Sequence, residues 1–223
     1  MRLCFCLHCN LWMFEICAIY PLLHNFLAKP NSSSLVTGES IDANPRRYFF
    51  FPVNADWQKR IAAFLGSSQP KKPKNHYGEI NQSTELQHCY PKKLVNVKGD
   101  GACLPRCLSM VIYGNQRHHV MLRNAVVDFM IRNSETAPLD AGFLHRMEEM
   151  RKTTTWMGTD EVQAFAYLLD TPIYTCVQVK SNGKPNQFCW QRLPHPELAS
   201  NVGNDRGIYL LNAHDHFQVI TKP

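Results

Sequence analysis

The hydrophobic pattern of the chain changes along its second half. Between residues 104 and 169, apolar positions recur every three to four residues, and residues 104, 107, 108, 111 and 112 give the clearest helix face. Beyond residue 172, shorter apolar runs separated by turn residues are typical of strands. The pattern predicts helices over residues 104–113, 119–133, 140–151 and 160–169, and strands over residues 172–179, 187–193, 207–211 and 216–220.

The order of these elements predicts the fold class. Helices come first and strands later, with short turns around Asn182-Gly183 and Asn204-Asp205 between the strands. Asp160 is expected to cap the last helix, with Gln163 at its third position. This order favours an α+β sandwich whose small sheet, antiparallel or mixed, is flanked by helices.

The first half is organised differently. Residues 1–46 comprise an apolar, cysteine-rich segment and a linker rich in Ser, Asn and Pro. In a basic extension over residues 47–93, Asn54 or Asp56 is expected to cap a short helix that docks on the main domain, placed at residues 94–223. The carboxylate of Glu15 interrupts the apolar segment, which argues against a membrane-spanning helix; a weak anchor or a signal is the alternative.

One cysteine lies where nucleophilic chemistry is favoured. Residues 94–97 form an apolar, strand-like run, Gly99 and Gly101 supply a tight turn, and Cys103 then opens the first helix of the main domain. The unpaired N–H groups and the positive dipole end of a helix start favour the thiolate, which is the nucleophilic form. The same N–H groups can hold an oxyanion. Cys103 is therefore the candidate nucleophile.

A cysteine nucleophile needs a base, and the best-placed histidine is close to the C-terminus. Residues 208–220 are expected to form two short strands joined by a polar turn at residues 212–215. His216 would open the second strand, where rigid backbone holds a half-exposed imidazole, a geometry that suits a general base. His214 is the competitor, but it would lie in the looser turn.

These residues resemble a known family. The stretch Asp100-Gly101-Ala102-Cys103-Leu104, with Arg106, is similar to the nucleophile motif of the ovarian-tumour (OTU) cysteine proteases, most of which are deubiquitinases. Their second motif, an apolar strand, a polar turn and a histidine followed by an aromatic residue, resembles residues 208–217. Residues 158–174 resemble the helix and strand between the two motifs. The resemblance covers roughly residues 94–221.

The resemblance implies a papain-like OTU sandwich and a thiol-dependent isopeptidase that removes ubiquitin or a ubiquitin-like modifier from lysine. Cys103 would attack, His216 would act as the base, and Asp100 would belong to the catalytic motif, its backbone shaping the oxyanion hole. From local physics alone, Asp100 is also a capping residue at a helix start. Arg106 is expected to tether a neighbouring loop. No cofactor or metal is required, and ubiquitin or ubiquitinated proteins are the expected partners.

Three positions depart from the family pattern. Pro105 stands where an aromatic residue is usual, and Cys107 where a small residue is usual; a first helical turn tolerates the proline, and the helix's inner face accommodates the thiol. Gln218 stands where many members place Asn or Asp to orient the histidine. The orienter is therefore Gln218, Asp100 or a residue elsewhere. The alternative function is a catalytically impaired OTU-like interaction module.

The distribution of charge and the cysteine content bear on the partners and the cellular compartment of the protein. Residues 1–98 hold 12 Lys/Arg against 6 Asp/Glu, whereas residues 99–223 hold 12 against 12, so the excess of +6 lies upstream of the predicted catalytic domain. No basic stripe with interleaved aromatics supports nucleic-acid binding. Nine cysteines, an odd number, do not suggest a disulfide scaffold, and those from Cys89 onward are scattered as reduced thiols are. We expect a cytoplasmic or nuclear monomer that does not engage membranes. Four acidic residues near the second and third helices are a charged face or, by the resemblance, a ubiquitin-contacting surface: Glu135, Asp140, Glu148 and Glu149.

Overall fold

The computed structural model describes residues 48–67, 75–77, 84–86, 89–134, 140–179, 187–194 and 206–223. The apolar segment and linker of residues 1–46, and the predicted turns at Asn182-Gly183 and Asn204-Asp205, lie outside these residues. Among the described residues, no helix combines the length and apolar character needed to cross a membrane. Nor do three or more metal-binding side chains gather anywhere in that part of the chain. The cysteines in the described part of the chain are not joined in disulfide bonds: Cys89, Cys103, Cys107, Cys176 and Cys189.

The predicted helices of the second half are confirmed to within about one residue at each end. Helical periodicity fixes them because each buries one apolar face against the sheet or a neighbouring helix. A further helix precedes them, where Asn54 caps the first turn. The described helices are α3 (Ala55–Phe64), α4 (Cys103–Tyr113), α5 (His119–Arg132), α6 (Ala141–Arg151) and α7 (Thr159–Leu168).

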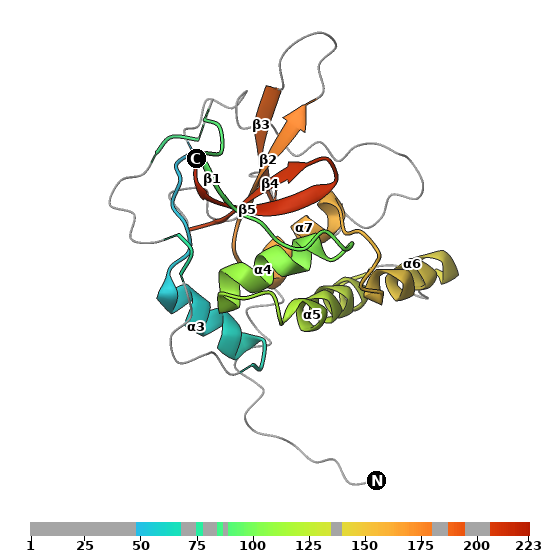
Figure 1. The fold of residues 1–223 in the computed structure, drawn as a ribbon. Coiled ribbons are helices and arrows are strands. Elements are labelled where there is room, and N and C mark those ends of the chain that lie inside the picture. The colour runs from blue at the N-terminus through green and yellow to red at the C-terminus, as the bar shows by residue number, and fades with distance from the viewer. Residues whose placement is uncertain are drawn as a thin grey trace.

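The described strands form one mixed sheet in the order β1-β5-β4-β2-β3 (Figure 1). β2 and β4 pair in parallel, and the other neighbours pair antiparallel. The α+β class is therefore confirmed. The strands are β1 (Lys93–Val95), β2 (Ile173–Val179), β3 (Gln187–Leu193), β4 (Ile208–Ala213) and β5 (His216–Lys222).

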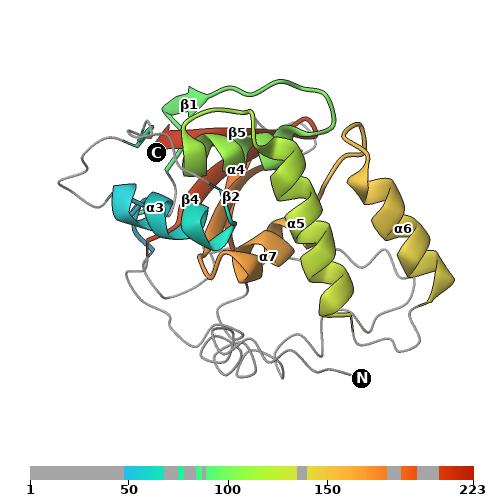
Figure 2. The ribbon, with the colours of Figure 1, turned by 90° about the horizontal axis from the view of Figure 1, so that it is seen from below.

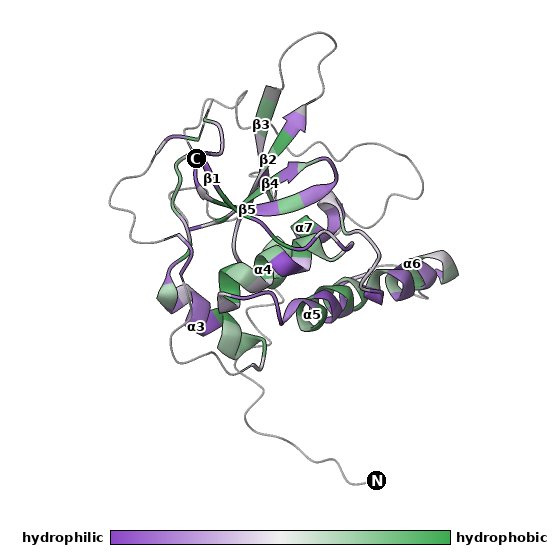
Figure 3. Ribbon diagram, in the orientation of Figure 1, coloured by the Kyte–Doolittle hydropathy of each residue, from purple (hydrophilic) through white to green (hydrophobic). Residues whose placement is uncertain are grey.

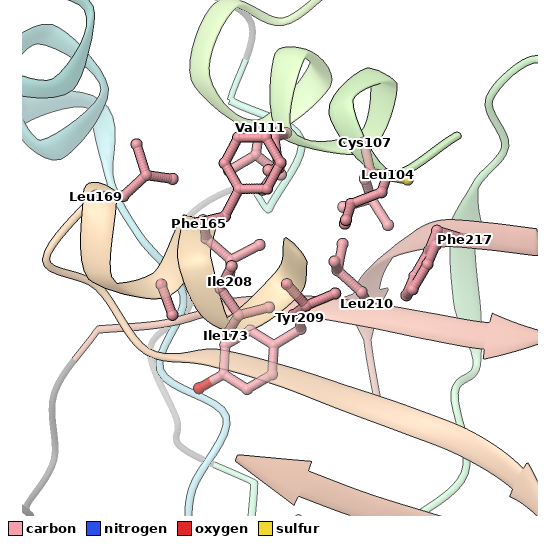
Figure 4. Packing of buried hydrophobic residues seen from close by; sticks show 14 of the residues in the cluster. Leu104, Cys107, Val111, Phe165, Leu169, Ile173, Ile208, Tyr209, Leu210 and Phe217 are labelled. Atoms are coloured by element: carbon pink, nitrogen blue, oxygen red, sulfur yellow. The ribbon is translucent and has the colours of Figure 1, made fainter. Parts of the chain in front are cut away.

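The helices gather on one face of the sheet (Figure 1, Figure 2). From α4, the residues Leu104, Cys107 and Val111 point toward α7 and β4, so the main core lies between the helices and the sheet (Figure 4). The other face is covered by the segment that precedes α3. There the Phe50 ring lies 4.3 Å from the ring of Tyr209, a buried residue of β4. The extension upstream of residue 94 thus contributes to the core of the main domain.

Helix α3 docks as the sequence predicts. Asn54 accepts a hydrogen bond from the backbone N–H of Trp57, and Gly66 follows the helix with a left-handed φ of 68°. The Trp57 indole donates to the Thr171 hydroxyl at 2.8 Å, which anchors the helix to the chain that follows α7. Trp57 and Ile61 are buried, whereas half of Phe64 is exposed.

The predicted cap of α7 is wrong. The helix begins after Gly158. Glu161, at the third position of the helix, accepts a hydrogen bond from the backbone N–H of Gly158 at 2.7 Å. Asp160 instead accepts a hydrogen bond from Arg146, so it is drawn to the preceding helix. A carboxylate at the third position can satisfy a helix start without a side chain at the cap itself.

Candidate active site

Cys103 is the first residue of α4 and is 2% exposed. Ala102, at the cap position, offers no side-chain hydrogen bond to the helix start. The backbone N–H groups of the first helical turn are therefore not satisfied by a cap, and the positive end of the helix dipole lies at the sulfur-bearing residue. The structure thus places Cys103 at a helix start, where an oxyanion could be held.

The turn before Cys103 requires glycine at position 101. Gly101 has a φ of 79°, in the left-handed region, and a Cβ added there would lie 2.2 Å from the backbone oxygen of Thr154. The carbonyl of Gly101 accepts a hydrogen bond from the fully buried Arg123 at 2.9 Å. Close packing and a buried cation together fix the path of the chain into α4.

Asp100 is held by Arg106 in a two-point contact. The Arg106 guanidinium donates to both carboxylate oxygens, at 3.0 and 2.6 Å, and the backbone N–H of Ala102 donates to one of them. The hydrogen bonds from Arg106 lower the pKa of Asp100 to about 2. The predicted tether role of Arg106 is confirmed, and its partner is Asp100 within the nucleophile motif itself.

Cys107 lies one turn further along α4 and is fully buried. Burial raises the pKa of the Cys107 thiol well above its ordinary value, and the neighbouring Cys103 acts in the same direction. A thiol held in its protonated form is a poor nucleophile. Cys107 therefore behaves as a core residue, as its position on the inner face of the helix predicts.

His216 opens β5 and pairs across the hairpin with Ala213, the last residue of β4. The predicted turn was too long, because Asn212 and Ala213 belong to the strand and only His214 and Asp215 form the turn. Both turn residues have positive φ, 53° and 56°, which matches the twist of a two-residue hairpin. His214 is exposed, whereas His216 is half-buried at the strand mouth.

The helix that begins with Cys103 packs against the strand that begins with His216. From β1 the chain runs past β5 toward the β4–β5 hairpin before it turns into α4 (Figure 1, Figure 2). A Cβ added at Gly99, in this turn, would lie 3.7 Å from both Nδ1 and Cε1 of the His216 ring. The Nδ1 side of the imidazole therefore faces the turn that leads to Cys103.

The imidazole is held by a residue that the sequence pattern did not single out. His216 Nε2 lies 3.1 Å from Asn96 Oδ1, and the side-chain amide of Gln218 donates to the same oxygen at 3.2 Å. Because an amide oxygen only accepts, the imidazole presents its N–H at Nε2, which leaves Nδ1 able to take a proton. Gln218, the predicted orienter, thus contacts the imidazole's partner. In the sequence, Asn96 could have been noticed as the polar residue inside the apolar run of residues 94–97.

Trp156 borders the base from the segment between α6 and α7. Its indole N–H donates to the backbone carbonyl of Asp215 at 2.9 Å, and its ring stacks on Phe217 at 6.0 Å. These two residues flank His216 in the chain. Trp156 is 39% exposed, which is unusual for so large a ring and leaves one side of it open to solvent.

In this α+β sandwich, a buried cysteine at a helix start thus lies in a helix that packs against a strand opening with histidine. A family profile described as "Vertnin, OTU domain" matches residues 95–136, from the end of β1 past the end of α5. OTU domain-containing protein 3 of Mus musculus is 38% identical over 78 residues, which are 33% of this chain and 20% of that protein. Both matches therefore point to similarity with OTU domains over part of the chain. The chain spans about a fifth of the length of this curated relative.

Solved OTU domains are similar to this chain over more than half of its length. The OTUD1 OTU domain is 19% identical, with a TM-score of 0.47 over 56% of this chain and 83% of that one. The viral OTU domain protease from Dera Ghazi Khan virus is 18% identical, with a TM-score of 0.45 and coverages of 57% and 78%. The Hazara virus OTU, solved bound to ubiquitin, is 14% identical, with a TM-score of 0.44 and coverages of 57% and 79%.

Proposed function

We propose that this OTU domain is a thiol-dependent deubiquitinase that hydrolyses the bond between ubiquitin, or a similar modifier, and a lysine side chain. The observation that carries the proposal is the hydrogen bond between Asn96 and Nε2 of His216. It selects the imidazole tautomer whose free Nδ1 faces the turn leading to Cys103, as a general base for a thiol requires.

The proposed reaction follows from these positions. Nδ1 of His216 takes the thiol proton, and the sulfur of Cys103 bonds to the carbonyl carbon at the modifier's C-terminal glycine. The oxyanion is held by backbone N–H groups at the start of α4, which receive no side-chain cap. The imidazolium gives its proton to the leaving lysine amine as the C–N bond breaks. Water, activated by the same imidazole, then hydrolyses the thioester and restores the thiol.

Asp100 supports this reaction through the backbone. Its carboxylate is engaged by Arg106 and by the N–H of Ala102, so it shapes the turn that presents Cys103. Asn96 supplies the orientation that many family members draw from a residue two positions after the histidine. We therefore assign the orienting role to Asn96, with Gln218 holding the Asn96 side chain in place.

The acidic surface proposed for ubiquitin is smaller than the sequence suggests. Asp140 caps α6 through the backbone N–H of Gly142, and Glu149 pairs with Lys152 at 2.5 Å. Glu135 lies outside the described residues. Of the described members of the set, Glu148 alone makes no ion pair or side-chain hydrogen bond with the described residues. Charge on this face therefore adds little to the case for ubiquitin.

The near-complete burial of Cys103 favours a second function, an interaction module that keeps the fold without turnover. One experiment separates the two. Purified protein is mixed with ubiquitin that carries a C-terminal electrophile, and the labelled residue is mapped by mass spectrometry. Labelling of Cys103, lost in Cys103→Ser and retained in Cys107→Ser, supports the enzyme. Binding of ubiquitin without any adduct supports the interaction module.

A further inference from the structure

Residues 150–158, which we call the connecting segment, run from the end of α6 to the start of α7. None of its residues belongs to the proposed catalytic pair. The segment nevertheless contacts the chain next to both members of that pair, Gly101 on the cysteine side and Asp215 on the histidine side. Such a bridge is what a catalytic site needs when its two reacting groups come from distant parts of the sequence.

On the cysteine side, the bridge runs through the buried guanidinium of Arg123. Its Nη1 donates to the carbonyl of Met150 at 2.7 Å, and its Nη2 donates to the carbonyls of Gly101 and Thr155, both at 2.9 Å. Nη2 of Arg123 therefore links the backbone two residues before Cys103 to the backbone just before Trp156. Burial lowers the pKa of Arg123, and the negative charge of Glu161 acts in the opposite direction. No carboxylate among the described residues forms an ion pair with the guanidinium, whose hydrogen bonds go to these carbonyls.

On the histidine side, the bridge runs through Trp156. The indole N–H donates to the Asp215 carbonyl, just before His216, and the ring stacks at an interplanar angle of 16° on Phe217, just after it. The His214–Asp215 turn and the hairpin end are hydrophilic, in contrast to much of α4 (Figure 3). Trp156 therefore adds both a hydrogen bond and an aromatic contact beside this polar turn.

We propose that Arg123 and Trp156 are positioning residues. Through the connecting segment they hold the turn that carries Cys103 and the hairpin that carries His216 in a fixed relation. The proposal rests on the proposed function, because it concerns the same catalytic pair. Small displacements of reacting groups have large effects on rate, so loosening this bridge lowers reactivity at Cys103 without removing a reacting group.

The sharpest test is Trp156→Phe, which keeps an aromatic ring against Phe217 and removes only the N–H that binds Asp215. Two rates are measured: alkylation of Cys103 by iodoacetamide, and hydrolysis of ubiquitin bearing a C-terminal fluorophore. We expect both the alkylation rate and kcat to fall roughly 3- to 10-fold, the effect of one lost neutral hydrogen bond, while KM is unchanged. Tyr90→Phe is the control, because Tyr90 packs on Phe188 of β3, at the opposite edge of the sheet from β1.

A second variant, Arg123→Lys, keeps the charge but has no planar fork to reach three carbonyls. We expect a larger loss of both rates, measured together with a thermal melt. If Arg123→Lys does not fold, Trp156→Phe still decides the question. Unchanged rates in Trp156→Phe overturn the proposal, and a raised KM with an unchanged alkylation rate overturns it in favour of a substrate contact.

Failure of this proposal can be told apart from failure of the proposed function. Iodoacetamide reacts with the thiol directly and needs no ubiquitin, so the alkylation rate reports the coupling even in a protein that does not turn over. If wild-type protein forms no adduct with the ubiquitin electrophile, the enzymatic function is wrong. If it forms the adduct and Trp156→Phe alkylates at the wild-type rate, only the positioning role is wrong.

Discussion

The two halves of the candidate site are built in different ways. On the cysteine side, the contacts are with the backbone or buried: Gly101 packs on the Thr154 carbonyl, and Arg123 binds carbonyls from inside the core. On the histidine side, they are side-chain contacts near the surface, where Asn96 is exposed and bonds both His216 and Gln218. The cysteine is thus held by the fold, and the histidine by a small polar network.

This difference has a physical consequence. Buried groups that lose a partner carry the full desolvation cost, so changes on the cysteine side should reduce the stability of the whole domain. Exposed amides exchange their partners for water at little cost, so changes on the histidine side should leave the fold intact and act on the reaction alone. Stability and activity should therefore respond separately to changes on the two sides of the site.

The largest effect is expected from His216→Ala. Removing the proposed base should lower kcat for a fluorogenic ubiquitin substrate by roughly 10³-fold or more, because proton transfer to and from the sulfur is lost. The melting temperature should stay close to that of the wild type, since the half-buried ring lies at a strand mouth. His214→Asn is the matched control, because Asn tolerates the left-handed turn position. If the two variants lose activity equally, His216 is not the base.

Gly101→Ala tests the cysteine side of the candidate site. A methyl group at this position meets the Thr154 carbonyl at 2.2 Å and stands in left-handed backbone, so we expect a loss of about 3–5 kcal/mol in the free energy of unfolding. Urea denaturation measures the loss. Gly66→Ala is the control, since Gly66 has a similar φ of 68° but nothing within 4 Å of the added Cβ, and should cost only about 1–2 kcal/mol. Equal losses would mean that the Thr154 contact is unimportant.

Local patterns predicted the elements that carry the site. The helix starting near Cys103 and the strand starting at His216 are each encoded within about ten residues, by apolar spacing and by the turn that precedes them. The predicted limits of β3, residues 187–193, coincide with the observed ones for the same reason. Such limits can be predicted without knowing which other elements the helix or strand packs against.

The partners could not be predicted because they come from distant positions. Asn96 is 120 residues from His216, and the three carbonyls bound by Arg123 are 22, 27 and 32 residues away from it. Asn96 and Arg123 were visible as polar residues in apolar runs, but such residues have many competing explanations. The wrong cap of α7 has a related cause, since Asp160 is drawn away from the helix start by Arg146, a residue of another helix.

Asn96→Ala sharpens the comparison within the histidine side. Loss of the acceptor frees the imidazole to rotate and removes its preference for the Nε2–H tautomer, so kcat should fall roughly 10- to 100-fold. Gln218→Ala should cost less, because Gln218 acts through Asn96. Both variants should unfold at the wild-type urea concentration. If Gln218→Ala is the more damaging change, Gln218 itself orients the imidazole and Asn96 is secondary.

The smallest effect is expected from Asp100→Asn, and it appears as a change in pH dependence. The pKa of Asp100 is lowered to about 2 by Arg106, from 3.8, so the carboxylate stabilises the folded state above about pH 4 and this contribution is lost as the pH falls toward 2. Near pH 7, Asp100→Asn should cost on the order of 1 kcal/mol, since the side chain is a quarter exposed. Its melting temperature should fall less steeply than that of the wild type between pH 4 and 2. A kcat loss as large as that of His216→Ala, without this change in pH dependence, would show that Asp100 acts in the reaction itself and is not a residue that shapes the turn before Cys103.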